Sequence, residues 1–190
     1  MNLLHRLQGG IETERLLLRH WKRGDFEAYL AVVSNPEVMT PAGCRAARDL
    51  EEAASMFRRD RRNEMCYAIL LKEGGQVVGR IKYQNDLRRF HVNSLSLGYE
   101  LRQDCWGRGY MTEALRAMVA NAFERRKVDV VAVSHFAGNT RSQRVIEKCG
   151  FRLEGTVPWA LRRFDGEICD DVCYSILRED YFAAQDAAFR

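Results

Sequence analysis

A glycine pair separates a strand-like run from a long amphipathic helix in residues 93–126 of this sequence. Gly107 and Gly109 follow the run 93–101, and apolar residues recur at i, i+3, i+4, i+7 and i+8 from Thr112 to Arg126. The amides of a helix start converge on one point with positive potential, and glycine lets an anion such as a diphosphate approach the backbone. A tight turn that merely needs positive φ remains the alternative at this point.

Two other nucleotide-binding patterns are excluded at this segment. Thr112 occupies the third glycine position of the dinucleotide fingerprint G-x-G-x-x-G, and Asp129 opens the next strand instead of closing it. The phosphate loop G-x-x-x-x-G-K-[ST] does not occur in the sequence. A nicotinamide-dependent oxidoreductase and a P-loop enzyme are therefore disfavoured.

Composition predicts a globular chain with a small anionic ligand. The 190 residues are 46% hydrophobic and 29% charged, which excludes disordered and low-complexity classes, and they suit a single domain. A net charge of +4 favours a small anion over nucleic acid. Because we find no signal-peptide core and no long apolar run, we expect a cytoplasmic protein without a membrane partner.

Cysteine and histidine spacing gives no sign of a metal site. The six cysteines contain no C-x-x-C pair, and the four histidines share no ligand-like spacing, so no metal is assigned. We expect the cysteines to be reduced thiols of the core.

The hydrophobic pattern predicts an α/β (α+β) fold in which helices pack on a mixed sheet. We expect one domain over residues 1–190, with an N-terminal extension at 1–10 and a C-terminal tail at 182–190. Gly98 lies inside a strand, where the ladder is expected to open. Strands are expected at 14–20, 66–72, 76–83, 93–101, 129–135, 151–157 and 170–177, and helices at 25–35, 46–62, 112–126 and 139–148.

Four blocks of the sequence resemble the GCN5-related N-acetyltransferase (GNAT) family, within it the ribosomal-protein N-terminal acetyltransferase-like (RimJ/RimL-type) branch. The resemblance implies a mixed, mostly antiparallel sheet of about seven strands, with helices on both faces and a splay between strands 4 and 5. The blocks are IETERLLLR at 11–19, LGYEL at 97–101 with WGRGYMTEA at 106–114, NTRSQRVIEKCGF at 139–151, and DVCYSILRED at 171–180.

The resemblance also implies a binding site for acetyl-CoA. Its diphosphate is expected on the backbone of Trp106, Gly107, Arg108, Gly109, Tyr110 and Met111, with the pantetheine arm along the strand end near Leu101. Asn139 and Ser142 match family residues at the arm and the thiol, although without the family they are an N-cap and an N3 residue. Trp159 and Tyr174 lie where relatives build the acceptor wall, although lone aromatic residues more often belong to a core.

Three positions depart from the family and leave proton transfer open. Asp104 stands where the loop usually begins with Gln or Arg, Ile146 where many relatives have Tyr, and Leu161 where a Glu can serve as base. We therefore expect Ser142 to donate a hydrogen bond to the departing thiolate. Glu100 is the candidate base, although a solvated strand residue is the more common role. Its rivals are Asp170, Asp171, His91 or a chain of water molecules.

The function expected from the resemblance is acetyl transfer from acetyl-CoA to a primary amine, either a protein N-terminal α-amine or a small-molecule amine. The alternative is a non-catalytic acyl-CoA-binding or sensor module, which release of free thiol with a panel of amines would distinguish. The acceptor loops, about 39–45 and 87–93, show no recognisable pattern. The resemblance also raises a homodimer, because relatives often pair through their last strands.

Overall fold

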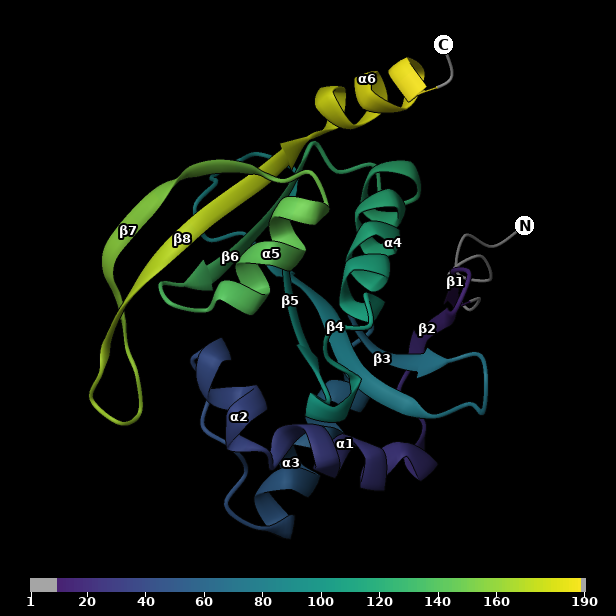
Figure 1. The fold of residues 1–190 in the computed structure, drawn as a ribbon, viewed down its shortest axis with the longest axis vertical. Helices are drawn as coiled ribbons and strands as arrows, with labels where there is room; N and C mark the ends of the chain where they lie inside the picture. Colours follow the sequence, from purple (N-terminus) through teal and green to yellow (C-terminus); the bar gives the residue numbers. More distant parts are fainter. Residues whose placement is uncertain (1–9, 189–190) are drawn as a thin grey trace. The chain divides into compact units, whose positions relative to one another are not determined.

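The computed structural model describes residues 10–188, and its helices and strands follow the predicted order (Figure 1). Residues 1–9 of the expected N-terminal extension lie outside the described residues. The α-helices are α1 (Phe26–Val33), α2 (Pro36–Met39), α3 (Leu50–Arg62), α4 (Tyr110–Glu124), α5 (Thr140–Lys148) and α6 (Arg178–Ala188). The strands are β1 (Ile11–Glu12), β2 (Leu16–His20), β3 (Cys66–Leu71), β4 (Val77–Asn85), β5 (Ser94–Leu101), β6 (Val130–Phe136), β7 (Arg152–Arg162) and β8 (Ile168–Leu177).

The strands form one mixed, mostly antiparallel sheet, as predicted. Their order is β1-β2-β3-β4-β5-β6-β8-β7, which makes eight strands within residues 10–188 because the short β1 adds to the seven expected. β5 and β6 run parallel, whereas β6 with β8 and β7 with β8 run antiparallel. The crossover from β5 to β6 runs through α4, as a parallel connection requires.

The ladder between β5 and β6 ends before either strand does. Pairing runs from Ser94 with Val130 to Leu97 with Val133, while β5 continues to Leu101 and β6 to Phe136. The last paired residue directly precedes Gly98, where the sequence predicts that the ladder opens. β5 and β6 are the strands expected at 93–101 and 129–135, the fourth and fifth of the predicted sheet, between which the splay is expected.

The chain divides into two compact units. The first contains the chain up to Lys82 together with Tyr99–Ala117, and the second contains Tyr83–Gly98 and the chain from Met118 onward. The expected single domain stays a prediction.

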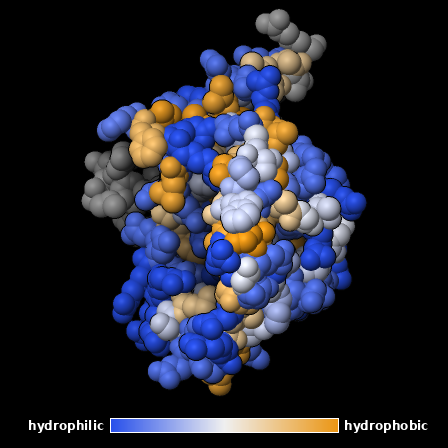
Figure 2. All heavy atoms as spheres, turned by 90° about the vertical axis from the view of Figure 1, so that its left-hand side faces the viewer, coloured by the Kyte–Doolittle hydropathy of each residue, from blue (hydrophilic) through white to orange (hydrophobic). Residues whose placement is uncertain are grey.

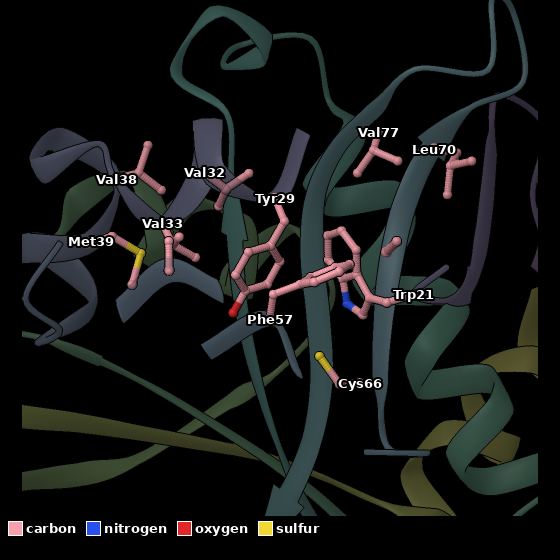
Figure 3. Close-up of a cluster of buried hydrophobic side chains, with 12 residues drawn as sticks. Trp21, Tyr29, Val32, Val33, Val38, Met39, Phe57, Cys66, Leu70 and Val77 are labelled. Atoms are coloured by element: carbon pink, nitrogen blue, oxygen red, sulfur yellow. The ribbon is translucent and has the colours of Figure 1, made fainter. Parts of the chain in front are cut away.

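The core of the first unit lies between helices α1 to α3 and the strands β3 and β4. Figure 3 shows Trp21, Tyr29 and Phe57 in mutual contact at its centre, with ring centroids 5.0 to 5.9 Å apart. The edge-to-face and tilted geometries are those that aromatic quadrupoles favour. Because every residue from Cys66 to Leu70 is buried, β3 is covered on both faces.

The second unit consists largely of β6, the long β7–β8 hairpin and the helices α5 and α6 (Figure 1). Val130–Val133 of β6 are buried, as the β-branched run predicts. The hairpin turns at Gly166, whose φ of +91° explains the predicted Asp165-Gly166 turn. Gly150, with φ +82°, ends α5 at the predicted left-handed position.

Several expectations about element boundaries are wrong. Helix α4 begins at Tyr110, two residues early, and α3 begins at Leu50 because Asp49 accepts a hydrogen bond from the Glu52 N–H at 2.8 Å and caps it. The strand expected at 151–157 is too short, because β7 extends to Arg162 through a bulge. Helix α6 runs into the expected tail at 182–190, whose assignment as a tail stays a prediction.

The expectation that all the cysteines are core thiols is also wrong. Cys66, Cys105, Cys169 and Cys173 are buried and free, whereas Cys44 is exposed and Cys149 is half-buried.

No helix within residues 10–188 is long and apolar enough to cross a membrane.

Candidate functional site

The loop between β5 and α4 has the backbone shape that the glycine pair predicts. Gly107 and Gly109 have φ values of +76° and +80°, a left-handed region that other residues rarely adopt. A short 3₁₀ turn, Gln103–Cys105, precedes them, and the 15-residue helix α4 begins at Tyr110. These φ values fit both interpretations of the glycine pair, an anion-binding loop and a tight turn, because either one can precede the start of a helix.

Side chains from the β1–β2 segment hold this loop in place. The guanidinium of Arg15 donates to the Arg108 carbonyl oxygen at 3.0 Å and to Glu113 Oε2 at 2.7 Å. Thr13 Oγ1 and the Arg15 N–H donate to Glu113 Oε1 at 2.6 and 2.8 Å. Glu113 lies in the first turn of α4, so these bonds fix the helix start to the edge of the sheet.

These contacts also stabilise the charge of Glu113. Burial alone would raise the pKa of Glu113, but the hydrogen bonds from Thr13 and Arg15 outweigh it and hold the pKa below its ordinary value. An ionised carboxylate in the first turn also interacts favourably with the helix dipole.

On the side toward β5, the loop is fixed by an indole and an ion pair. Trp106 Nε1 donates to the Leu101 carbonyl oxygen at 2.9 Å. Arg102 donates to both carboxylate oxygens of Asp104, at 3.1 and 2.5 Å, and the hydrogen bond lowers the pKa of that carboxyl. The charge of Asp104, at the position where the resemblance implies Gln or Arg, is therefore compensated by its neighbour.

The loop fits a diphosphate by its shape and its charge. A Cβ at Gly107 would meet nothing within 4 Å, and one at Gly109 would lie 3.4 Å from Arg15 Nη2, so the space beside both residues is open or bounded by a cation. The first amides of an α-helix have no acceptor within the helix and carry positive potential. Within residues 101–114, Arg102 and Arg108 equal Asp104 and Glu113 in number, and Arg15 of the β1–β2 segment adds a further positive charge beside Gly109.

Glu100, the candidate base, lies in a buried charge cluster of the first unit. Its carboxylate accepts from Arg80 Nε and Nη2 at 2.6 and 2.9 Å, and Arg80 Nη1 also donates to Asp60 at 2.5 Å and to the Tyr29 oxygen at 3.1 Å. All four residues are less than a tenth exposed. Burial opposes the charge of Arg80, but Glu100 and Asp60 outweigh it and raise the pKa of Arg80.

This cluster changes how the role of Glu100 is read. Both of its carboxylate oxygens already bind a guanidinium, and proton uptake would weaken that ion pair. The geometry favours a role in joining β4 to β5, and the assignment as base stays a prediction. Arg80 gave no signal in the sequence, because it lies 20 residues from its partners at 60 and 100 in a strand of ordinary pattern.

In the second unit, Asn139 and Ser142 lie at the start of α5. The Asn139 side chain accepts from the Ser142 N–H at 3.1 Å, so the N-cap that the sequence predicts is confirmed. Their contacts with a pantetheine arm stay predictions. Ile146, on the same helix, is fully buried and belongs to the core.

Trp159 and Tyr174 lie in very different surroundings. Trp159 on β7 is 77% exposed, so the alternative of a core aromatic is wrong for this residue. Tyr174 on β8 is buried, and its hydroxyl lies 3.3 Å from His135 Nε2. His135 Nδ1 lies 3.0 Å from the Phe136 carbonyl oxygen, which can only accept. In the tautomer with its proton on Nδ1, the His135 ring therefore accepts from the Tyr174 hydroxyl, and burial raises the pKa of the tyrosine.

The other candidate bases are also placed in the second unit. Asp171 is buried and paired with Arg88, while His91 lies in the loop after β4 with φ +61°. Asp170 Oδ1 accepts the Trp159 N–H at 2.8 Å.

Comparison with known proteins assigns the chain to a family. A family model described as acetyltransferase (GNAT) domain matches residues 15–152. YoaA of Bacillus subtilis, described as an uncharacterized N-acetyltransferase, is 27% identical over 173 residues. The match covers 88% of this chain and 96% of YoaA.

Two crystal structures show the same fold. A GNAT-family acetyltransferase from Bacillus anthracis is 26% identical with a TM-score of 0.80, over 90% of this chain and 99% of its own. The ribosomal-protein-S5-alanine acetyltransferase of Vibrio fischeri is 19% identical with a TM-score of 0.73, over 90% of this chain and 97% of its own. At this identity the second likeness concerns the fold alone. The chain belongs to the GNAT family of N-acetyltransferases, acyltransferases that use acetyl-CoA as the acetyl donor.

Proposed function

We propose that this enzyme acetylates a primary amine, and that the loop Trp106–Met111 holds the diphosphate of acetyl-CoA. The observation that carries the proposal is the pair of left-handed glycines immediately before a 15-residue helix. Bound acetyl-CoA would supply a thioester carbon for a neutral amine to attack. The C–S bond then breaks, CoA leaves as a thiolate, and the amine proton passes to Glu100, to one of its rivals or to water.

The residues of this chain contribute mainly by positioning. Holding amine and thioester together is worth roughly 7 to 11 kcal/mol of barrier, so an enzyme whose Ile146 replaces the usual acid is physically reasonable. A thiolate with a pKa near 8.5 also departs without a strong acid. Ser142 is the proposed hydrogen-bond donor to it, and Asn139 is the proposed contact of the pantetheine arm.

Two classes of acceptor follow from the resemblance. One is a protein N-terminal α-amine, in keeping with the ribosomal-protein acetyltransferase of Vibrio fischeri that shares this fold, and the other is a small-molecule amine. Trp159 and Tyr174 are the proposed acceptor contacts. The homodimer stays a prediction that sedimentation tests.

The test is release of free thiol from acetyl-CoA with 1,4-diaminobutane and with a tripeptide carrying a free α-amine. An N-acetylated tripeptide serves as the negative control, and enzyme without amine corrects for the exposed thiol of Cys44. We expect amine-dependent thiol release and a mass increase of the amine by one acetyl group. Binding of CoA without thiol release from either amine would instead favour the acyl-CoA-binding module.

Gly109→Trp tests the placement of the diphosphate, and Gly74→Trp is its matched control. Gly74 has nearly the same φ, +76°, and lies in the turn between β3 and β4, where a Cβ would meet nothing within 4 Å, whereas one at Gly109 would lie 3.4 Å from Arg15 Nη2. Both substitutions carry the same left-handed strain, so a loss of activity confined to Gly109→Trp assigns the loop.

A further inference from the structure

Trp159 combines two features that are unfavourable for folding. The residue is 77% exposed, and its φ of +56° lies in the left-handed region, where a bulky residue is an outlier. Glycine or asparagine would fit this backbone with less strain. Figure 2 shows the side of the molecule where the β7–β8 hairpin lies in Figure 1, and hydrophobic and hydrophilic residues are interspersed on it.

A wide bulge in β7 produces this conformation. Val157 pairs with Asp171 and Leu161 pairs with Cys169, so the three residues 158–160 lie opposite the single residue Asp170. Bulges re-aim side chains and are common beside functional sites.

Asp170 connects the bulge to the start of α5. Its Oδ1 accepts the Trp159 N–H at 2.8 Å, and its carbonyl oxygen accepts the Ala137 N–H at 2.9 Å. Ala137 lies two residues before the cap Asn139, within the same unit. One residue thus fixes the backbone that carries Trp159 and also the segment that the proposed function assigns to the acetyl donor.

We infer that Asp170 is a positioning residue that holds Trp159 for contact with the acceptor amine. This inference rests on the proposed function and adds a specificity determinant to it. A primary amine arrives mostly as an ammonium ion, and the face of an exposed indole attracts such a cation. The left-handed bulge presents the indole, and the Asp170 carboxylate compensates for the strain by accepting the backbone N–H.

The first test measures the KM for 1,4-diaminobutane, the KM for acetyl-CoA, kcat and Tm in Trp159→Gly. Glycine favours φ +56°, so we expect an unchanged or higher Tm. Loss of the cation–π contact should raise the KM for the amine about fivefold and leave the KM for acetyl-CoA unchanged. Phe164→Ala is the matched control, since Phe164 is a 51% exposed aromatic residue of the same hairpin, and we expect no change in either KM.

The second test concerns Asp170 itself. Asp170→Ala should raise the KM for the amine as Trp159→Gly does, and Asp170→Asn should restore it, because its amide oxygen still accepts the Trp159 N–H. Combining Trp159→Gly with Asp170→Ala should raise this KM no further, since both act through one indole. An unchanged amine KM in Trp159→Gly, or equal effects of Asp170→Asn and Asp170→Ala, would overturn the inference.

Fluorescence separates this inference from the proposed function. Among the three tryptophans, Trp159 is highly exposed, whereas Trp21 is 4% exposed and Trp106 is half-buried. With CoA present, 1,4-diaminobutane should change the emission of the wild type but not that of Trp159→Phe. Absent thiol release refutes the proposed function, whereas an emission change that persists in Trp159→Phe, or no change in the wild type, refutes the contact.

Discussion

Replacing Arg80 by methionine is expected to destabilise the first unit strongly. The substitution keeps the length of the side chain but leaves Asp60 and Glu100 without their shared cation, in positions only 5% and 6% exposed. Breaking a buried ion pair by removing one partner costs about 3 to 5 kcal/mol. For a chain of 190 residues, this corresponds to a loss of roughly 6 to 20 °C in Tm.

The pH dependence of the stability loss in Arg80→Met tests the cluster more specifically than the magnitude of that loss. Without the guanidinium, both buried carboxyls are more stable protonated, so the variant should recover stability relative to the wild type as the pH falls from 7 to 5. Calorimetric melting of both proteins over this range is the assay. A cost below about 1 kcal/mol, or one that does not depend on pH, would refute the assignment of this cluster as a structural element.

Glu100→Gln distinguishes the two roles considered for Glu100. The amide keeps one acceptor for Arg80, so we expect a stability loss of about 1 to 2 kcal/mol. A base contributes about 10²- to 10⁴-fold to the rate. If Glu100 is structural, kcat stays within about tenfold of the wild type and its pH profile is unchanged. A larger loss of kcat at unchanged Tm would restore Glu100 as the base.

Three further outcomes are expected from single substitutions. The lowered pKa of Glu113 stabilises the folded wild type above pH 4.5, and this stabilisation is lost as the pH falls further. Glu113→Gln lacks the carboxylate and should therefore lose less stability than the wild type on acidification below pH 4.5. Melting curves at pH 7 and 4 check this. Gly79→Ala should destabilise by about 1 to 3 kcal/mol, since its Cβ would lie 2.5 Å from the Glu100 carbonyl oxygen, and urea unfolding measures it. Asn139→Ala should lose about 1 kcal/mol of helix capping in the same assay whereas Asn139→Asp keeps it; if the amide also contacts the pantetheine arm, both should raise the KM for acetyl-CoA.

Local patterns made much of this fold predictable from the sequence. The glycines at 74, 107, 109, 150 and 166 all have positive φ, and their role depends only on their own backbone. The cap at Asn139 and the opening of the β5–β6 ladder beside Gly98 are equally local. From such local features, the sequence alone predicts the loop before α4.

What the sequence could not predict depends on distant partners. Arg80 joins residues 20 positions away in each direction, and Asp170 meets Trp159 only because β7 carries two extra residues in its bulge. The sequence predicts a strand that stops at Val157, whereas β7 continues through Pro158 to Arg162, although proline is uncommon inside a strand. The exposure of the Trp159 side chain follows from the register of β7 with β8 at the bulge, which the residue type alone does not reveal.

Calorimetric titration of CoA into the wild type, Gly74→Trp and Gly109→Trp tests the central claim most directly. We predict saturable binding with equal affinity in the wild type and Gly74→Trp, and a loss of detectable binding in Gly109→Trp at unchanged far-ultraviolet circular dichroism. Equal affinity in all three proteins would contradict the placement of the diphosphate on this loop.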